Sequence, residues 1–274
     1  MNIKIKNFDR KTYQQIYHSL TSVNTICVAA NCPNRYECFT AKTATFLLLG
    51  NICTRNCQYC NVASGRPAEV DYDALTNILA AIDNLQLEYI VLTQVTRDDL
   101  MDGGASYMVA AVDAIRQKKS AVKLELLISD LGGNWSALRK ILQVKPAVLN
   151  HNIEVTDNLF PMLRPEGGYK RSLQLLRIAN EFGVVTKSGL MVGFGETMAD
   201  IYRTLQDLRD AGVKIITIGQ YMQPNENKVP VVKWYQEKEF LTIEKVAYQM
   251  GFSFVAAGTM VRSSYRAKEG FNEL

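Results

Sequence analysis

From residue 44 onward, short apolar runs alternate along the chain with amphipathic stretches. Six apolar runs are rich in β-branched and aliphatic residues, and they predict buried strands over 44–50, 88–95, 122–129, 147–154, 184–193 and 213–220. Between and after them, apolar positions recur at helical spacing over 71–85, 104–118, 134–143, 168–182, 197–210 and 237–250. Single helices between strands require parallel pairing with right-handed crossovers. The pattern therefore predicts an α/β protein.

The number of strand–helix units favours an incomplete barrel. Eight units usually need about 250 residues by themselves, and six fit here, although an open doubly wound sheet also satisfies the pattern. We expect three parts: a polar N-terminal extension (1–43), the barrel (44–258) and a short C-terminal tail (259–274). In either architecture, function gathers at the carboxyl ends of the strands.

Composition narrows the class of protein. The chain has 274 residues, of which 47% are hydrophobic, so wholesale disorder is excluded. The formal net charge is +4 and the basic residues are dispersed, which argues against a nucleic-acid partner and only weakly for acidic partners. No apolar run approaches the roughly 18 residues that cross a bilayer, and the first residues have no apolar signal core. We therefore expect no membrane segment and a cytoplasmic location.

The six cysteines change the picture most, because all of them lie between Cys27 and Cys60. A chain of this length builds its own core and, without an export signal, is not expected to depend on disulfides. Six thiols crowded into one short segment indicate a site.

The downstream group has the spacing Cys53-x3-Cys57-x2-Cys60, directly after the first predicted strand. Three thiolates in one tight loop can bind three irons of a 4Fe–4S cube and leave the fourth iron open. The alternatives are a zinc loop or redox-active thiols. Zinc sites prefer paired two-residue gaps, so the wide first gap fits zinc poorly.

The upstream group is Cys27-x4-Cys32-x5-Cys38. A structural zinc loop is the simple interpretation, but a fourth ligand is then missing, because neither His18 nor His151 is placed to supply it. Three thiolates again suggest a 4Fe–4S cluster, whose fourth ligand would come from elsewhere in the chain.

The downstream loop, with an aromatic residue before its last cysteine, resembles the signature of the radical S-adenosylmethionine superfamily. The resemblance implies a partial (β/α)6 TIM-like barrel and an open iron that binds the amino and carboxylate groups of S-adenosylmethionine. Reductive cleavage then yields methionine and a 5′-deoxyadenosyl radical, which removes hydrogen from a substrate. Matching positions imply a set of cofactor-binding residues in the loop and at the ends of the strands: Tyr59, Asp102, Gly103, Asn152, Glu154, Met191 and Glu196.

The two cysteine spacings together resemble the lipoyl synthase family. Blocks such as TATFLLLGNICTRNCQYCNVASGRP (43–67), VLNHNIE (148–154), TKSGLMVGFGET (186–197) and the tail motif RSSY (262–265) carry the likeness over about residues 26–266. The resemblance implies an auxiliary 4Fe–4S cluster on the upstream cysteines, whose fourth ligand is a serine of the tail. We place this ligand on Ser264, with Ser263 as the alternative.

For the reaction, the resemblance implies sulfur insertion at carbons 6 and 8 of an octanoyl chain attached to a lysine, with the auxiliary cluster as sulfur donor. Implied partners are an octanoylated lipoyl carrier domain (a glycine cleavage H-type protein or a 2-oxoacid dehydrogenase acyltransferase subunit), a ferredoxin or flavodoxin reductant, and an iron–sulfur carrier protein. Two other interpretations stay open: an auxiliary-cluster radical enzyme with a different acyl or peptide substrate, and a non-catalytic iron–sulfur carrier.

The chain departs from the family pattern at a few positions. The glutamine–proline block of the family usually continues with two histidines, whereas Asn225-Glu226-Asn227-Lys228 stands here. Val28 and Asn51 occupy positions that are commonly acidic in the family. None of these positions is an expected cluster ligand, so the departures bear on carrier docking and on the substrate channel.

Overall fold

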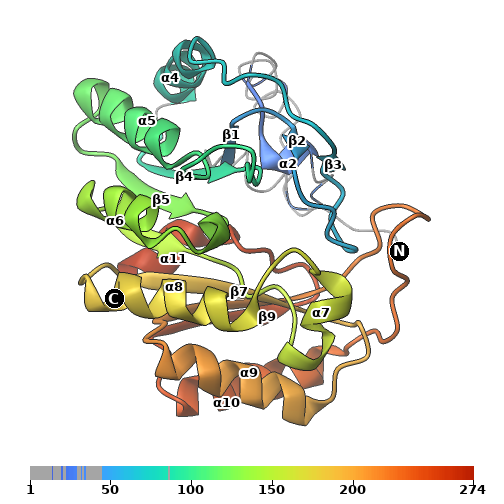
Figure 1. Cartoon of the computed structure of the whole chain (residues 1–274). Helices are drawn as coiled ribbons and strands as arrows, with labels where there is room; N and C mark the ends of the chain where they lie inside the picture. Colours follow the sequence, from blue (N-terminus) through green and yellow to red (C-terminus); the bar gives the residue numbers. More distant parts are fainter. Residues whose placement is uncertain are drawn as a thin grey trace.

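The centre of the molecule is a parallel sheet of seven strands, seen in a computed structural model that describes residues 14, 20, 23–29, 32, 34, 45–85 and 87–274 (Figure 1). The strands are β1 (Thr45–Leu48), β4 (Tyr89–Gln94), β5 (Lys123–Leu127), β6 (Val148–Asn150), β7 (Thr186–Val192), β8 (Ile215–Gln220) and β9 (Phe254–Gly258). Their order in space, β1-β4-β5-β6-β7-β8-β9, follows their order in the chain, and every neighbouring pair is parallel. A doubly wound sheet reverses its strand order at a switch point, so the unreversed order decides for the incomplete barrel.

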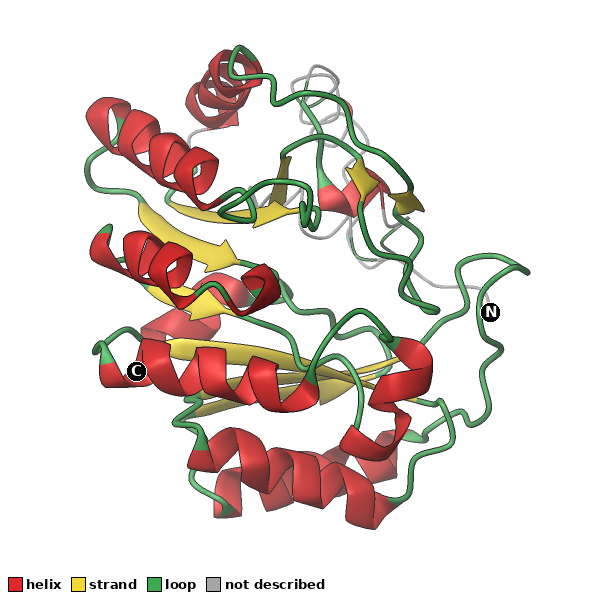
Figure 2. Cartoon of the chain, viewed as in Figure 1, coloured by secondary structure: helices red, strands yellow, loops and turns green. Residues whose placement is uncertain are grey.

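Helices fill the crossovers and cover the outer face of the curved sheet (Figure 2). They are α4 (Ala74–Leu85), α5 (Ala105–Lys118), α6 (Trp135–Gln143), α8 (Tyr169–Glu181), α9 (Met198–Asp210) and α10 (Glu237–Gln249). Local sequence explains their starts: at α9, Thr197 and Asp200 form a capping box in which each side chain accepts a hydrogen bond from the other's backbone amide. The predicted α/β partial barrel is confirmed, with helix limits within about three residues of those expected from the pattern.

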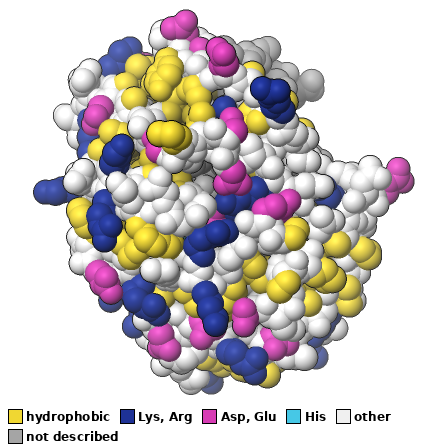
Figure 3. Space-filling view, viewed as in Figure 1, with side chains coloured by type: hydrophobic (Ala, Val, Ile, Leu, Met, Phe, Trp, Pro, Cys, Tyr) yellow, Lys and Arg dark blue, Asp and Glu magenta, His cyan; other side chains and the backbone are white. Residues whose placement is uncertain are grey.

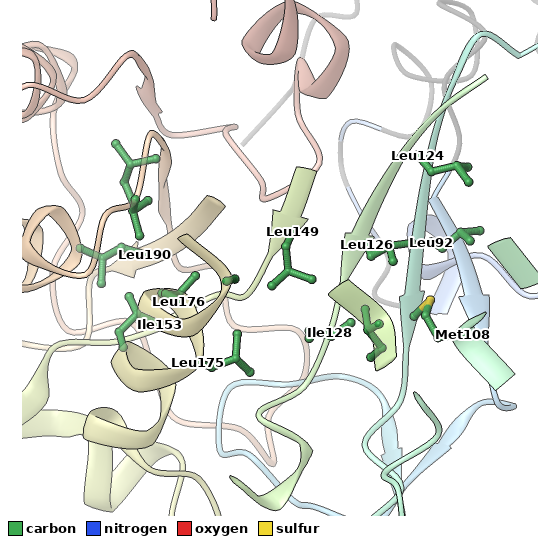
Figure 4. Packing of buried hydrophobic residues seen from close by; sticks show 14 of the residues in the cluster. Leu92, Met108, Leu124, Leu126, Ile128, Leu149, Ile153, Leu175, Leu176 and Leu190 are labelled. Atoms are coloured by element: carbon green, nitrogen blue, oxygen red, sulfur yellow. The ribbon is translucent and has the colours of Figure 1, made fainter. Parts of the chain in front are cut away.

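Alternation along the strands separates the outer layer from the barrel interior. Leu92 of β4 lies beside Met108 of α5 and belongs, with Leu124 and Leu126 of β5, to the large apolar core (Figure 4). All four side chains are buried to 1% exposure or less, and each contributes roughly 1.5–3 kcal/mol through burial. The intervening residues of the same strands point to the other face, which is the interior of the barrel.

A polar network occupies part of the barrel interior. Lys187 Nζ lies 3.0 Å from Glu125 Oε1, and both side chains are at most 2% exposed. Asn150 Nδ2 donates to the same carboxylate oxygen at 2.8 Å, and the Tyr89 hydroxyl donates to Oε2 at 2.8 Å. Four strands therefore meet at one buried carboxylate, whose charge is balanced by a single lysine.

The last strand extends the sheet beyond the six strands counted in the sequence. The short apolar run 252–258 is not among the predicted strands. In the structure, its residues 254–258 form β9, which pairs with β8 from Ile215–Phe254 to Gly219–Gly258. Short elements complete the description: α2 (Ile26–Ala29), β2 (Ile52–Cys53), β3 (Ala63–Ser64), η1 (Leu131–Gly133), η2 (Asp157–Leu159), α7 (Phe160–Leu163) and α11 (Ala267–Asn272).

Segments from both ends of the chain pack against the barrel. Thr25 forms an antiparallel bridge with Phe46 at the β1 edge, and Leu47 donates its amide to the Asn24 carbonyl at 2.8 Å. Near the other end, Phe271 of α11 packs against Tyr89, with ring centroids 6.0 Å apart. These contacts cover an exposed sheet edge and one end of the interior.

The surface carries mixed charge. On the face seen in Figure 3, basic and acidic side chains are interspersed and neither sign gathers into one field. Within the described ranges, every helix is too short or too polar to cross a lipid bilayer.

Candidate functional site

Cys53, Cys57 and Cys60 lie in one loop that leaves the sheet directly after β1. At its base, β2 and β3 pair in parallel with Cys53 opposite Ser64, and the Gly65 amide donates to the Cys53 carbonyl at 2.9 Å. At its tip, the Cys60 amide donates to the Cys57 carbonyl at 3.1 Å and closes a tight turn. The loop is therefore fixed at both its base and its tip.

The Cys57 and Cys60 thiols are in an environment that favours the neutral form. Burial raises the pKa of Cys60 to about 11. Burial also raises the pKa of Cys57, although the nearby Arg164 guanidinium opposes the effect. Because ligating sulfur must be deprotonated, a positively charged metal centre would have to drive the loss of these protons.

The donor set fits a 4Fe–4S cube better than a single ion. The five described cysteines are free of disulfides. In the same part of the chain, no three Cys, His, Asp or Glu side chains converge closely enough to hold one metal ion. A cube offers its irons at separate corners, so three thiols spread around one loop suit it, whereas a zinc ion needs its ligands around a single centre.

A cavity of about 180 Å³ lies between the barrel, the 26–34 segment and the C-terminal tail. Barrel residues on its wall come from the start of β1, from β7 and β8, and from the segment that follows β6. Seven residues singled out in the sequence line this one cavity: Cys27, Cys32, Asn152, Glu154, Met191, Ser263 and Ser264. The fold thus brings together positions that lie more than two hundred residues apart in the chain.

Asn152 presents a free acceptor to this cavity. Its Nδ2 donates to Glu154 Oε1 at 3.1 Å, whereas its Oδ1 is buried without a hydrogen-bond partner in the described structure. A Cβ on Gly189 of β7 would lie only 2.7 Å from Oδ1, so glycine is needed for the strand to pass this close. A buried, unpartnered amide oxygen beside a cavity is the feature expected of a wall that hydrogen-bonds a ligand.

Glu154 connects the cavity to the cysteine loop. Its backbone is left-handed (φ 70°), and it pairs with β7 through the Glu154 amide to the Gly189 carbonyl at 2.9 Å. Burial raises the pKa of its carboxyl group, while Arg164 and the Asn152 amide oppose the effect. The carboxylate also interacts electrostatically with Cys57 and Cys60, although none of the three loop cysteines lines the cavity itself.

Another part of the cavity wall is formed by the 26–34 segment and the tail. Cys27 and Cys32 line it together with Ser263 and Ser264. The Asn34 side-chain amide donates to the Met260 carbonyl and ties the two segments directly. Burial raises the pKa of Cys27 to about 11, with a further contribution from Cys32. Cys38, the third member of this group, lies outside the described residues.

Two predicted cofactor-binding residues, Met191 and Tyr59, are apolar or aromatic, and they lie in different surroundings. Met191 lines the cavity at the end of β7. The Tyr59 ring packs against Phe194 with centroids 6.1 Å apart, and Phe194 in turn stacks on Tyr221 at 4.2 Å. The cysteine loop is thereby packed onto the carboxyl ends of β7 and β8.

Like Tyr59 and the three cysteines of the 53–60 loop, three further predicted residues do not line the cavity. Glu196 accepts hydrogen bonds from the Gly193 and Phe194 amides at 2.7 and 2.9 Å, so its carboxylate shapes the turn after β7. Asp102 accepts from the Gly104 and Ser106 amides and from the Ser106 hydroxyl, where it caps α5. Burial alone would raise the pKa of Asp102, but the bonds from Ser106 and Gly104 outweigh it and the pKa is lowered. Gly103 adopts φ 61° in the same turn.

Two basic residues beside the cysteine loop were missed in the sequence. Arg164 follows α7, is 8% exposed and donates from Nη1 to the Asn152 carbonyl at 3.1 Å. Lys228, in the stretch that departs from the family pattern, donates to Asn56 Oδ1 at 3.0 Å and to the Cys57 carbonyl at 3.2 Å. Neither stands in a metal-ligand spacing; the Pro-Glu-Gly-Gly turn after Arg164 was the available signal of an unusual loop.

The sequence of the chain was compared with family models and with the sequences of known proteins. The family model of the Radical SAM superfamily matches residues 47–208. A lipoyl synthase from Rubrobacter xylanophilus is 43% identical over 271 residues, covering 97% of this chain and 84% of the relative. One from Aquifex aeolicus is 45% identical, with 89% of this chain and 90% of the relative covered, and one from Shouchella clausii is 41% identical, with 99% and 89% covered.

Solved structures agree on the fold. Methylornithine synthase superimposes with a TM-score of 0.56 at 11% identity, covering 96% of this chain and 84% of that protein. SuiB of Streptococcus suis bound to S-adenosylmethionine gives a TM-score of 0.60 at 13% identity, covering 82% of this chain and 56% of that protein. At such low identity these likenesses concern the fold alone.

Proposed function

We infer the function from one premise, that this chain belongs to the lipoyl synthase family of the Radical SAM superfamily. Its reaction is the insertion of two sulfur atoms, at carbons 6 and 8, into an octanoyl chain that is amide-linked to a lysine. The substrate is an octanoylated lipoyl carrier.

One observation carries the assignment within this structure. A single cavity is lined by Glu154, whose carboxylate interacts with Cys57 and Cys60, and by Cys27, Cys32, Ser263 and Ser264. An extended acyl chain in this space would contact the upstream cysteines and would reach Glu154, the cavity residue that interacts with the downstream loop. Sulfur insertion by two cooperating centres requires such a shared space.

The residues present fit the two clusters and the cofactor. When bound, S-adenosylmethionine and the cluster on Cys53, Cys57 and Cys60 supply a radical that removes hydrogen, and the auxiliary cluster supplies sulfur. We assign the auxiliary cluster to Cys27, Cys32, Cys38 and a tail serine, with Ser264 preferred over Ser263. Oxygen from serine is a harder ligand than thiolate and suits a cluster that must open.

The chain itself contributes position and shielding. Asn152 offers its free Oδ1 to a hydroxyl donor of the cofactor, and Glu154 offers its second carboxylate oxygen. Met191 and Tyr59 supply apolar surface for the adenine. We assign an indirect role to Glu196, Asp102 and Gly103. They do not line the cavity, and they shape turns next to the residues that bind the cofactor. The buried surroundings exclude water from the reacting carbons.

The identities of the partners belong to the proposal as well. We assign as substrate the lipoyl domain of a glycine cleavage H-type protein or of a 2-oxoacid dehydrogenase acyltransferase. A ferredoxin or flavodoxin would deliver the electrons, an iron–sulfur carrier protein would rebuild the auxiliary cluster, and the reaction would take place in the cytoplasm. The division of the chain into 1–43, 44–258 and 259–274 is part of the same proposal.

Anaerobic incubation of the reconstituted, reduced protein with S-adenosylmethionine and an octanoyl-lysine peptide tests the function. We expect 5′-deoxyadenosine in solution and, by mass spectrometry, a peptide that has gained two sulfur atoms. Formation of 5′-deoxyadenosine with an unchanged peptide would refute the substrate, and its absence from a fully loaded protein would refute the radical reaction.

A further inference from the structure

Arg55 is the most deeply buried residue of the cysteine loop. It stands between Cys53 and Cys57, yet it is 5% exposed, whereas the three cysteines of the loop are half-buried. A guanidinium in such a place costs free energy unless charged partners compensate it. Its contacts therefore indicate what the loop is built around.

Two carboxylates from different strand ends compensate this charge. Arg55 donates from Nε to Asp98 Oδ2 at 2.6 Å and from Nη2 to Asp98 Oδ1 at 2.8 Å, which is a bidentate pair. Nη2 also lies 2.7 Å from Oδ1 of Asp130, whose side chain is fully buried. Asp98 follows β4 and Asp130 follows β5, so one side chain fastens the loop to the ends of two strands.

The contacts continue from Asp130 back to the loop. Arg171 donates from Nε to Asp130 Oδ2 at 2.8 Å and from Nη2 to the Glu166 carbonyl at 3.0 Å. The Glu166 side chain accepts from the Asn56 amide at 3.4 Å. These contacts run from Arg55 through Asp130 and Arg171 to Glu166, and from Glu166 back to Asn56. They hold the loop at Arg55 and at Asn56, the two residues that precede Cys57.

We propose that Arg55 is a positioning residue that fixes Cys53 and Cys57 in a cluster-ready arrangement before iron is bound. The inference rests on the proposed function only in taking the 53–60 loop as the site of the radical-generating cluster. Its physical basis is that Arg55, the middle one of the three residues between Cys53 and Cys57, is held in place by its contacts with Asp98 and Asp130. The two thiols then need little reordering when the cluster enters, and they resist its release afterwards.

Replacing Arg55 with lysine distinguishes the effect of the positive charge from the effect of the hydrogen-bond geometry. A lysine keeps the positive charge but lacks the planar fork that binds Asp98 bidentately while it also reaches Asp130. The chain offers a matched control in Arg97, which is 2% exposed and forms a bidentate pair with Asp99 at 2.8 Å. Arg97 also donates to the Leu49 carbonyl, and no hydrogen bond or ion pair between it and the 53–60 loop occurs in the described structure.

The experiment compares R55K with R97K in the full-length chain. Removing the upstream thiols by Cys→Ala changes at positions 27, 32 and 38 leaves one cluster to observe. Each protein is reconstituted anaerobically, and three quantities are measured: the rate of iron loss to a chelator, the electron paramagnetic resonance spectrum of the reduced cluster, and the thermal unfolding midpoint without metal.

We expect R55K to lose iron about 10–100-fold faster than its parent and to show an altered spectrum, while R97K retains the parental rate and spectrum. D130N, which leaves the Asp98 pair intact, should show a smaller acceleration. Equal iron loss from R55K and R97K, or loss that follows the thermal midpoint alone in all three variants, would reduce Arg55 to a structural role and overturn the proposal. A parent that binds no iron would instead refute the assignment of the cysteine loop, and with it the proposed function.

Discussion

Replacing Gly189 with alanine tests whether the wall formed by Asn152 binds the cofactor. The added methyl group would lie 2.7 Å from Asn152 Oδ1 and 3.2 Å from Thr217 Oγ1. To restore an ordinary contact of 3.4 Å, the Asn152 amide must move by roughly 0.7 Å. The side chain yields more easily than the strand, because no hydrogen bond holds Oδ1 in place.

A displacement of this size at a binding group costs about ten- to hundredfold, or about 1.4–2.8 kcal/mol. We therefore expect the KM for S-adenosylmethionine in 5′-deoxyadenosine formation to rise by that factor in G189A. The thermal midpoint of the metal-free protein should change little. The assay is anaerobic initial-rate measurement over a range of S-adenosylmethionine concentrations.

Gly258 of β9 supplies the matched control. A methyl group there meets only Val261 Cγ2 at 3.5 Å, which is an ordinary contact, so G258A should keep the parental KM. A G189A protein with parental KM would refute the role assigned to Asn152. An equal rise in both variants would show that the effect comes from the sheet and not from the cavity wall.

Further predictions follow from the charges and thiols of the site. Alanine at any one of the downstream cysteines, Cys53, Cys57 and Cys60, should abolish 5′-deoxyadenosine formation. Alanine at any one of the upstream cysteines, Cys27, Cys32 and Cys38, should preserve some cleavage and stop sulfur insertion. Identical behaviour of the two groups would contradict this division. S264A should lose sulfur insertion while S263A retains it, and the reverse result would move the ligand to Ser263. K187M, which leaves Glu125 buried without its cation, should lower the free energy of unfolding in urea by about 3–5 kcal/mol, and a loss below 1 kcal/mol would contradict a stabilising role for this ion pair. Burial lowers the pKa of His151 to about 4, below its ordinary value of 6.5, so unfolding takes up a proton and stability is lost as the pH falls from 6.5 toward 4; H151Q should flatten this part of the thermal midpoint against pH, and an unchanged slope would contradict the burial of a neutral imidazole.

The sequence was sufficient for the barrel because its strands and helices have distinct periodicities. Buried strands such as 88–95 are continuous apolar runs, and helices such as 197–210 begin at a recognisable cap. The run 252–258 was harder to assign, since a short stretch that follows Gly251 and ends in Ala256, Ala257 and Gly258 has weak strand character. Its pairing with β8 is a tertiary contact, which no local pattern contains.

The candidate site could be predicted from the sequence where the spacing of residues by itself indicates a function. The cysteine triplets and the strand-end pair Asn152 and Glu154 could be singled out because their spacing and place in the chain are distinctive. The direction of a side chain is not local information, so the sequence did not predict that the carboxylates of Glu196 and Asp102 accept hydrogen bonds from backbone amides. Arg55 stood in the middle of the strongest motif, and its importance appeared only when Asp98 and Asp130 were seen to meet it.

In the proposed reaction, sulfur moves from the cluster on the upstream cysteines into an octanoyl chain. The most direct measurement is a single turnover by protein whose clusters were reconstituted with ³⁴S-sulfide, in a medium of natural sulfur, followed by mass spectrometry of the octanoyl-lysine peptide. We expect a product in which both added sulfur atoms are ³⁴S. A product with sulfur from the medium, or a peptide without sulfur despite formation of 5′-deoxyadenosine, would contradict the proposed reaction.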